Sequence, residues 1–126
     1  MSKIKDKEMT SYLIVNNDLN MSKGKIASQV AHGILDVHRF LLYNKIDHDK
    51  WLKNGEKIVA LKTDKKTIDF LLKEYGESII RENTFNVFPI YDAGRTQIVE
   101  GSLTVLACTP VTQDKIPDEI KKLKLL

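Results

Sequence analysis

Two polar segments of this chain contain most of the side chains that could carry out chemistry. The first, SKGKIASQVAH, spans residues 22–32, and the second, DAGRTQI, spans residues 92–98. Together they supply side chains that can transfer protons and bind an anion: Lys25, Gln29, His32, Asp92, Arg95 and Thr96. Each segment follows an apolar run that is typical of a buried strand. Because ligands in open α/β sheets bind beyond the carboxyl ends of strands, we expect both segments to leave one end of a sheet.

The first segment begins a predicted helix, and one flank of that helix is polar. Ser22 is a suitable N-cap, and apolar residues recur at helical spacing to about residue 42. At about 100° per residue, a single stripe beside the core-facing side contains Lys25, Gln29, His32 and Asp36. Such a stripe can line a cleft where a loop meets the helix. Spacing alone, however, favours a solvated helix flank, and a single histidine is more often packed than catalytic.

The N-terminus of this helix is also suited to an anion. Free backbone N–H groups and the positive end of the helix dipole attract negative charge there. Lys23 and Lys25 lie in the same turn, where a lysine is unfavourable unless an anion is close by. A phosphate or a carboxylate would remove this conflict, and Asp92 is one internal candidate. The segment SKGK lacks the GxxxxGK[ST] spacing of a P-loop, which argues against nucleotide hydrolysis.

The second segment presents a carboxylate on a short loop. Asp92 directly follows an apolar strand, and Gly94 permits a tight turn. A carboxylate close to a lysine stays ionised, so it could accept a proton and position a water molecule. An aspartate that caps its own turn is the other interpretation, and spacing does not decide between the two.

Composition excludes several other classes of site. Cys108 is the only cysteine among 126 residues, so an intrachain disulfide and a cysteine-rich zinc site are impossible. Its apolar neighbours predict a small buried side chain. His32, Asp36 and His38 do not share a helix face, and we expect His48 to be solvated in its polar stretch, so no metal site is predicted. The net charge of +3 permits a polyanionic partner without requiring one.

The apolar pattern predicts one α/β domain. Strands are expected at residues 11–16, 57–62, 85–91 and 103–109, and helices at about residues 22–42, 64–79 and 112–122. The order β-α-β-α-β-β-α indicates a four-stranded mixed sheet covered by helices, in which the two βα units pair in parallel. Residues 1–10 are expected to be a charged tail and residues 11–126 the domain. Without a signal peptide or an apolar run long enough to span a membrane, the expected location is the cytoplasm.

The two polar segments, in this order, resemble the signature of the type-2 peptidyl-tRNA hydrolases. The resemblance begins near Tyr12 and continues through GEKIVALK (residues 55–62), EGSLTVLACTP (100–110) and the terminal KLKLL (122–126). It implies an enzyme that cleaves the ester joining a peptide to the 3′ end of tRNA. It also implies a mixed-sheet α/β fold, a homodimer, peptidyl-tRNA as the partner and no cofactor.

The resemblance also assigns site residues. The catalytic lysine, aspartate and threonine of the family fall on Lys25, Asp92 and Thr96, and Gln29 and His32 match other positions of its cleft. The positions that would bind tRNA are Lys23, Arg95 and Gln97. The chain departs from the family at Asn16 and Asn20, where many relatives carry basic residues, and at Asn83, where a glycine is usual. The first two departures predict weaker tRNA binding rather than loss of the reaction.

Two other functions are compatible with the same residues. A non-catalytic tRNA-binding or adaptor module would use the same cleft, since a fold alone does not establish activity. A protein-interaction module would keep its binding after loss of the cleft residues. Intact Lys25, Asp92 and Thr96 count against the first of these alternatives.

Overall fold

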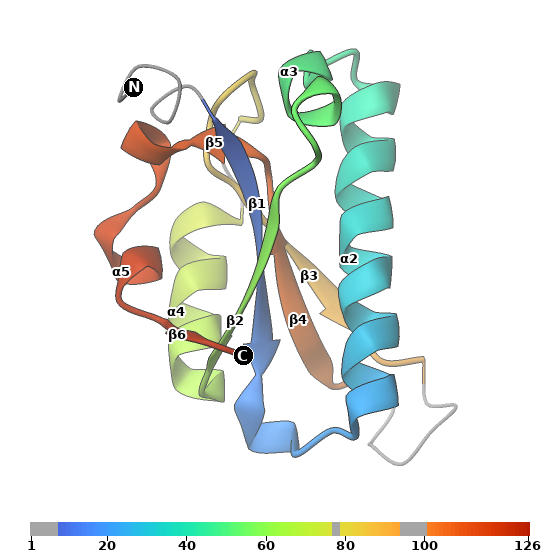
Figure 1. Ribbon diagram of the computed structural model, residues 1–126. Coiled ribbons are helices and arrows are strands. Elements are labelled where there is room, and N and C mark those ends of the chain that lie inside the picture. The colour runs from blue at the N-terminus through green and yellow to red at the C-terminus, as the bar shows by residue number, and fades with distance from the viewer. Residues whose placement is uncertain (1–7, 77–78, 94–100) are drawn as a thin grey trace.

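The computed structural model describes residues 8–76, 79–93 and 101–126. Within these residues the chain forms a mixed β-sheet with helices on both faces (Figure 1). The strands are β1 (Met9–Asn16), β2 (Ile58–Thr63), β3 (Val87–Tyr91), β4 (Leu103–Cys108), β5 (Val111–Thr112) and β6 (Lys124–Leu125). The helices are η1 (Asn17–Leu19), α2 (Lys23–Tyr43), α3 (Asp49–Lys53), α4 (Lys65–Tyr75), η2 (Gln113–Lys115) and α5 (Asp118–Lys121), where η marks a 3₁₀ helix.

The sheet places the carboxyl ends of three strands at the same end of the sheet. Its strands lie in the order β3-β4-β1-β2-β6, and β5 pairs with the start of β1. β2 is parallel to β1, whereas β4 is antiparallel to both β1 and β3. β1, β2 and β3 therefore run in the same direction. The start of α2, which follows β1, and Asp92, which follows β3, lie at the same end of the sheet, as the sequence predicts.

The sheet has six described strands rather than the four predicted, and the predicted element order is wrong at the C-terminus. A single helix was expected over residues 112–122, but this stretch contains the end of β5, η2 and the short α5. Pro117 explains the break, because a proline disfavours helical backbone at the preceding residue. Ile116 is accordingly extended, with φ −83° and ψ 122°. The terminal leucine-rich segment then pairs with β2 as β6.

The end of one helix and the presence of a short additional helix also differ from the prediction. α4 begins after Asp64, as expected, but ends at Tyr75 with Gly76 as its C-cap. The predicted stripe continued to Ile79, which is 74% exposed and contributes nothing to the core. No helix was predicted between residues 42 and 64, and residues 49–53 form α3 around the buried Trp51.

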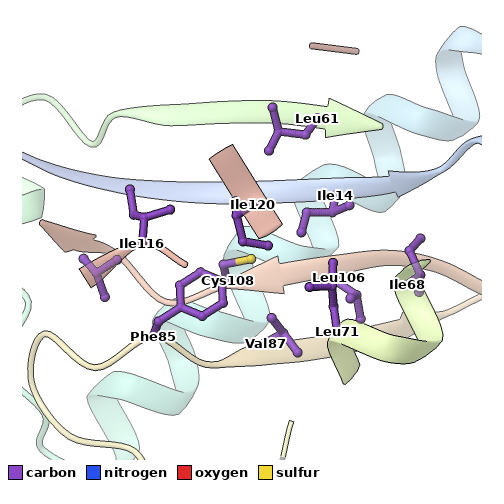
Figure 2. Close-up of a cluster of buried hydrophobic side chains, with 11 residues drawn as sticks. Ile14, Leu61, Ile68, Leu71, Phe85, Val87, Leu106, Cys108, Ile116 and Ile120 are labelled. Atoms are coloured by element: carbon purple, nitrogen blue, oxygen red, sulfur yellow. The ribbon is translucent and has the colours of Figure 1, made fainter. Parts of the chain in front are cut away.

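Two apolar layers hold the helices against the sheet. α2 packs on the face that contains Leu13 and Val105, while α4 and α5 cover the opposite face. Figure 2 shows that second layer, with Ile68 and Leu71 of α4 pointing toward Leu106 of β4. Cys108 lies within it as a fully buried side chain, and burial raises the pKa of its thiol, which confirms the prediction of a small buried hydrophobe. Among the described helices, none is long and apolar enough to cross a membrane.

Gly33 sets how closely α2 approaches the sheet. A Cβ atom at this position would lie 2.9 Å from Leu13 Cδ1 and 3.1 Å from Ala107 Cβ. A side chain at this position would require Leu13 and Ala107 to shift, so the glycine allows α2 to pack this closely on the sheet. The close approach brings the polar flank of α2 beside the end of β3, where the candidate site is found.

Candidate active site

The connection from β1 to α2 fixes the position of the first site segment. Asn16, the last residue of β1, is buried; its Nδ2 donates to Leu103 O at 2.9 Å and its Oδ1 accepts from Asp18 N at 3.1 Å. Asn20 then adopts a left-handed conformation, with φ 48°, which an asparagine tolerates better than most residues. Ser22 caps α2 by accepting a hydrogen bond from Lys25 N at 3.2 Å, as the sequence predicts. Lys25 is thereby held in the first turn of α2.

Lys25 and Asp92 form an ion pair at the end of β3. Lys25 Nζ donates a hydrogen bond to Asp92 Oδ1, and the two side chains are only 13% and 1% exposed. The ammonium lies at the positive end of the α2 dipole, so the carboxylate supplies the negative charge that this position needs. Asp92 is therefore the internal anion proposed for the helix N-terminus, rather than a residue that only caps its own turn.

The backbone around Asp92 is held on both sides of its loop. Asp92 N donates to Ser102 O at 2.8 Å, and Gly101 N donates to Asp92 O at 2.9 Å. Gly101 has φ +84°, which a glycine adopts without strain. These bonds extend the pairing of β3 and β4 by one step, so the position of the carboxylate is set by the sheet.

Gln29 is tied to the same two strands through a residue that sequence analysis missed. Gln29 Nε2 donates to Thr104 Oγ1 at 2.6 Å, and Thr104 Oγ1 donates to Ile90 O at 3.0 Å. Both side chains are buried, so this chain of hydrogen bonds is shielded from water. Threonine is common in strands, and nothing in the sequence distinguishes Thr104 from an ordinary strand residue.

A cavity of about 740 Å³ lies between α2 and the end of β3. Its walls come from residues 21–36 on one side and 89–93 on the other, and they include Lys25, Gln29, His32, Asp36, Pro89, Tyr91 and Asp92. The polar stripe of α2 therefore lines a cleft, and the interpretation as a purely solvated flank is wrong. His32 reaches this cavity from an exposed position, and Asp36 at the far end also faces Arg39, with 3.4 Å between Asp36 Oδ1 and Arg39 Nη1.

Three predicted site residues, Arg95, Thr96 and Gln97, lie in the range 94–100, outside the described residues. Lys23 is exposed in the first turn of α2. Asn83 has φ 54°, so the residue found where a glycine is usual adopts a conformation that suits glycine.

The two histidines away from the cleft form a pair. His48 is buried, which contradicts the prediction that it is solvated, and its Nε2 lies 2.9 Å from His38 Nδ1. Its other ring nitrogen lies 3.1 Å from Ile46 O, so both nitrogens have partners within the chain. Within the described residues no three acidic, histidine or cysteine side chains come together as metal ligands.

Comparison with known proteins identifies the family. The model of the family described as "Peptidyl-tRNA hydrolase PTH2" matches residues 9–126. The chain belongs to this family. It is 38% identical over 120 residues to the peptidyl-tRNA hydrolase of Methanococcus vannielii, a match that covers 90% of this chain and 96% of that protein. The peptidyl-tRNA hydrolase of Methanocaldococcus jannaschii is 37% identical over 128 residues, covering 94% of this chain and all of the relative.

A eukaryotic member of the PTH2 family matches equally well. Peptidyl-tRNA hydrolase 2 of Saccharomyces cerevisiae is 38% identical over 125 residues, which is 90% of this chain but 58% of the yeast protein. The chain thus corresponds to nearly the full length of its archaeal relatives and to a little over half of the yeast protein. These matches confirm the resemblance found in the sequence.

Proposed function

We propose that this PTH2 family member hydrolyses the ester bond between peptide and tRNA in peptidyl-tRNA and releases tRNA for reuse. The observation that carries the proposal is the buried Lys25–Asp92 ion pair at one end of the cavity. Ester hydrolysis needs an oriented water, stabilisation of a tetrahedral oxyanion, and a proton for the departing ribose oxygen. A carboxylate and an ammonium group in contact can supply all three.

In this mechanism Asp92 positions the attacking water and accepts a proton from it. The water oxygen bonds to the ester carbon, and the negative charge that forms on the carbonyl oxygen is stabilised by Lys25. The bond from carbon to the ribose oxygen then breaks, and that oxygen takes a proton from the Lys25–Asp92 pair. The products are a peptide with a free carboxylate and a tRNA with a free 3′ hydroxyl. We assign Thr96 to the water as a second partner, on the strength of the resemblance.

The remaining cleft residues shape the site. Gln29, which is fixed by Thr104, and His32 line the cavity next to Lys25, where an acyl group attached to the reacting ester would pass. The cavity continues along α2 to Asp36, so it offers room for the peptide side of the substrate. Lys23, at the exposed N-terminus of α2, is suited to a phosphate near the 3′ end of the tRNA, and we assign Arg95 and Gln97 to the same task.

The other features of the proposal come from the family resemblance. They are a homodimer and a reaction that needs no cofactor. A cytoplasmic location is also proposed, and it is consistent with the family. The non-catalytic alternative is not favoured, because a binding module has no use for a buried ion pair that faces a cavity. Light scattering of the purified protein tests the dimer directly.

The release of peptide from purified peptidyl-tRNA tests the function. Wild-type protein should release free peptide at low salt, and an added chelator should not slow it. Lys25→Ala should reduce the rate by about 10²-fold or more, since it removes the charge that stabilises the oxyanion. Lys50→Ala, on the distant helix α3, removes an equal charge and should leave the rate unchanged. A wild-type protein that binds tRNA without releasing peptide would contradict the proposal and favour the adaptor.

A further inference from the structure

Two lysines lie side by side on the strands at the β2–β6 edge of the sheet. In the antiparallel pairing of β2 with β6, Lys62 is directly opposite Lys124. Residues opposite each other in such a pair project from the same face, with their Cβ atoms about 5 Å apart. Like charges in this arrangement repel and destabilise the pairing. The arrangement therefore suggests a negatively charged partner outside the folded chain.

Within the described part of the chain no carboxylate pairs with either lysine. The four ion pairs found there use Lys25, Arg39, Lys57 and Lys65. The aspartates near this end of the sheet are engaged elsewhere: Asp18 accepts from Lys65 N at 2.9 Å, and Asp64 accepts from Thr67 N at 2.8 Å. The cross-strand pair, Lys62 and Lys124, is thus available for a ligand.

The cross-strand pair lies on the same side of the sheet as α2. Lys62 is opposite Val15 in the parallel pairing of β1 with β2, and Val15 belongs to the apolar layer under α2. α2 itself packs mainly on β1, β3 and β4, so β2 and β6 lie outside its main contacts. Ile58, two pleats from Lys62 on the same face of β2, is 43% exposed, so this part of the face is open.

The pair also lies at the end of the sheet that holds the candidate site. Lys62 is the penultimate residue of β2, and β2 runs parallel to β1, which leads into the first turn of α2. Figure 1 shows the end of β2 and the start of α2 at the same end of the molecule; Lys62 belongs to that strand end and Lys23 to that helix start. If an ester reacts at Lys25, an extended polyanion attached to it would leave the cavity across this end of the molecule.

We infer that Lys62 and Lys124 bind the phosphate backbone of the tRNA, away from its 3′ end, while the ester is held at Lys25 and Asp92. This inference rests on the proposed function and adds the path of the RNA, which runs from the α2 N-terminus across β2 and β6. Lysines bind phosphates as point charges and carry no sequence information, so these contacts contribute affinity for any tRNA. Each contact releases counterions and adds to the salt dependence of binding.

The test compares Lys62→Gln/Lys124→Gln with a matched double variant, Lys50→Gln/Lys53→Gln, on the distant helix α3. On full-length peptidyl-tRNA the first variant should raise KM about tenfold at low salt with kcat unchanged, and lower the slope of log KM against log salt by about 1.5. The α3 variant should match the wild type. An N-acetylaminoacyl ester of adenosine, which lacks the tRNA body, should be hydrolysed equally by all three proteins.

Two results would overturn the inference. One is a Lys62→Gln/Lys124→Gln variant with wild-type KM and salt slope on peptidyl-tRNA. The other is an unchanged KM together with a changed oligomeric state in sedimentation, which would assign this face to a contact between copies. Binding of deacylated tRNA provides a readout that does not depend on catalysis, so it tests the surface even if hydrolysis is not observed. If the double variant fails to fold, Lys124→Gln alone can be tested in its place, because Lys124 lies on an exposed two-residue strand.

Discussion

Gln29 and Thr104 are joined by a hydrogen bond of 2.6 Å from Gln29 Nε2 to Thr104 Oγ1, and this bond links α2 to β4. Thr104 in turn donates to Ile90 O, two residues before Asp92. The helix that carries Lys25 and the strand that carries Asp92 are therefore fixed relative to each other by a buried polar contact as well as by apolar packing. The cavity between them keeps its shape because both kinds of contact act together.

Removing the hydroxyl of Thr104 should lower stability and activity. Thr104→Val has a similar shape but leaves the buried amide of Gln29 without its acceptor, which costs about 1–3 kcal/mol of unfolding free energy. Turnover should fall as well, because Gln29 is no longer oriented beside Lys25. Urea unfolding and peptide release measure the two effects. Thr104→Ser keeps the hydroxyl and should retain both stability and turnover. A Thr104→Val protein with wild-type stability and turnover would show that the hydrogen bond is unimportant.

Gly33→Ala should move α2 away from the sheet. The added methyl group would lie 3.1 Å from Ala107 Cβ, and such overpacking costs about 1–3 kcal/mol, more than the roughly 1 kcal/mol that alanine gains in helix propensity. The melting temperature should fall, and so should turnover, because the helix carries Lys25. Gly24→Ala is the matched control for stability, since no atom lies within 4 Å of the Cβ it would add. Equal melting temperatures for the two variants would rule out a close approach at Gly33.

The hydrogen bond between Tyr75 and Glu119 predicts a pH dependence of stability. Tyr75 Oη donates to Glu119 Oε2 at 2.8 Å and connects α4 to α5. Burial and this hydrogen bond raise the pKa of Tyr75 to about 12, while the Tyr75 hydroxyl holds the pKa of Glu119 below its ordinary value. The stability that Tyr75 contributes to the fold is therefore fully present below the ordinary tyrosine pKa of about 10. It is lost as the pH rises through the raised pKa of about 12. The stability that Glu119 contributes is present above the ordinary glutamate pKa of about 4.3. It is lost as the pH falls through the lowered pKa of Glu119 in the folded protein.

Melting curves of wild type and Tyr75→Phe measure this effect. The wild type should be more stable than the variant between about pH 5 and pH 10, and the difference should shrink toward both extremes. Tyr43→Phe, at a tyrosine that is 86% exposed, should match the wild type throughout. A difference that is constant across the whole range would show that the bond does not depend on these two ionisations.

Sequence reasoning succeeded where the signal is local. β1, β2 and β4 coincide with continuous apolar runs. The starts of α2 and α4 lie close to their predicted positions, because the capping side chains of Ser22 and Asp64 act within three residues. It failed where the deciding contact is distant. β6 exists because the terminal leucines pair with β2, about 60 residues earlier in the chain, and no local pattern reveals that pairing. His48 is buried because it meets His38 of α2, which its polar neighbours in the sequence conceal.

The candidate site shows the same division. The helical spacing of Lys25, Gln29, His32 and Asp36 placed them on one flank, but whether that flank lines a cleft depends on where β3 ends relative to α2. The unfavourable position of Lys25 at the positive end of a helix dipole pointed to Asp92 as one candidate partner, and the ion pair confirms it. Thr104 carried no signal at all, because its role depends on its depth in the sheet and not on its residue type.

The measurement that tests the account most directly is turnover by Asp92→Asn on purified peptidyl-tRNA, with tRNA affinity measured in parallel. The substitution keeps the shape of the side chain but removes the charge that pairs with Lys25 and accepts the proton from water. We expect kcat to fall by about 10²-fold or more while the Kd for deacylated tRNA changes little, since the Asp92 side chain is only 1% exposed. A variant that releases peptide at nearly the wild-type rate would remove Asp92 from the reaction and contradict the proposed mechanism.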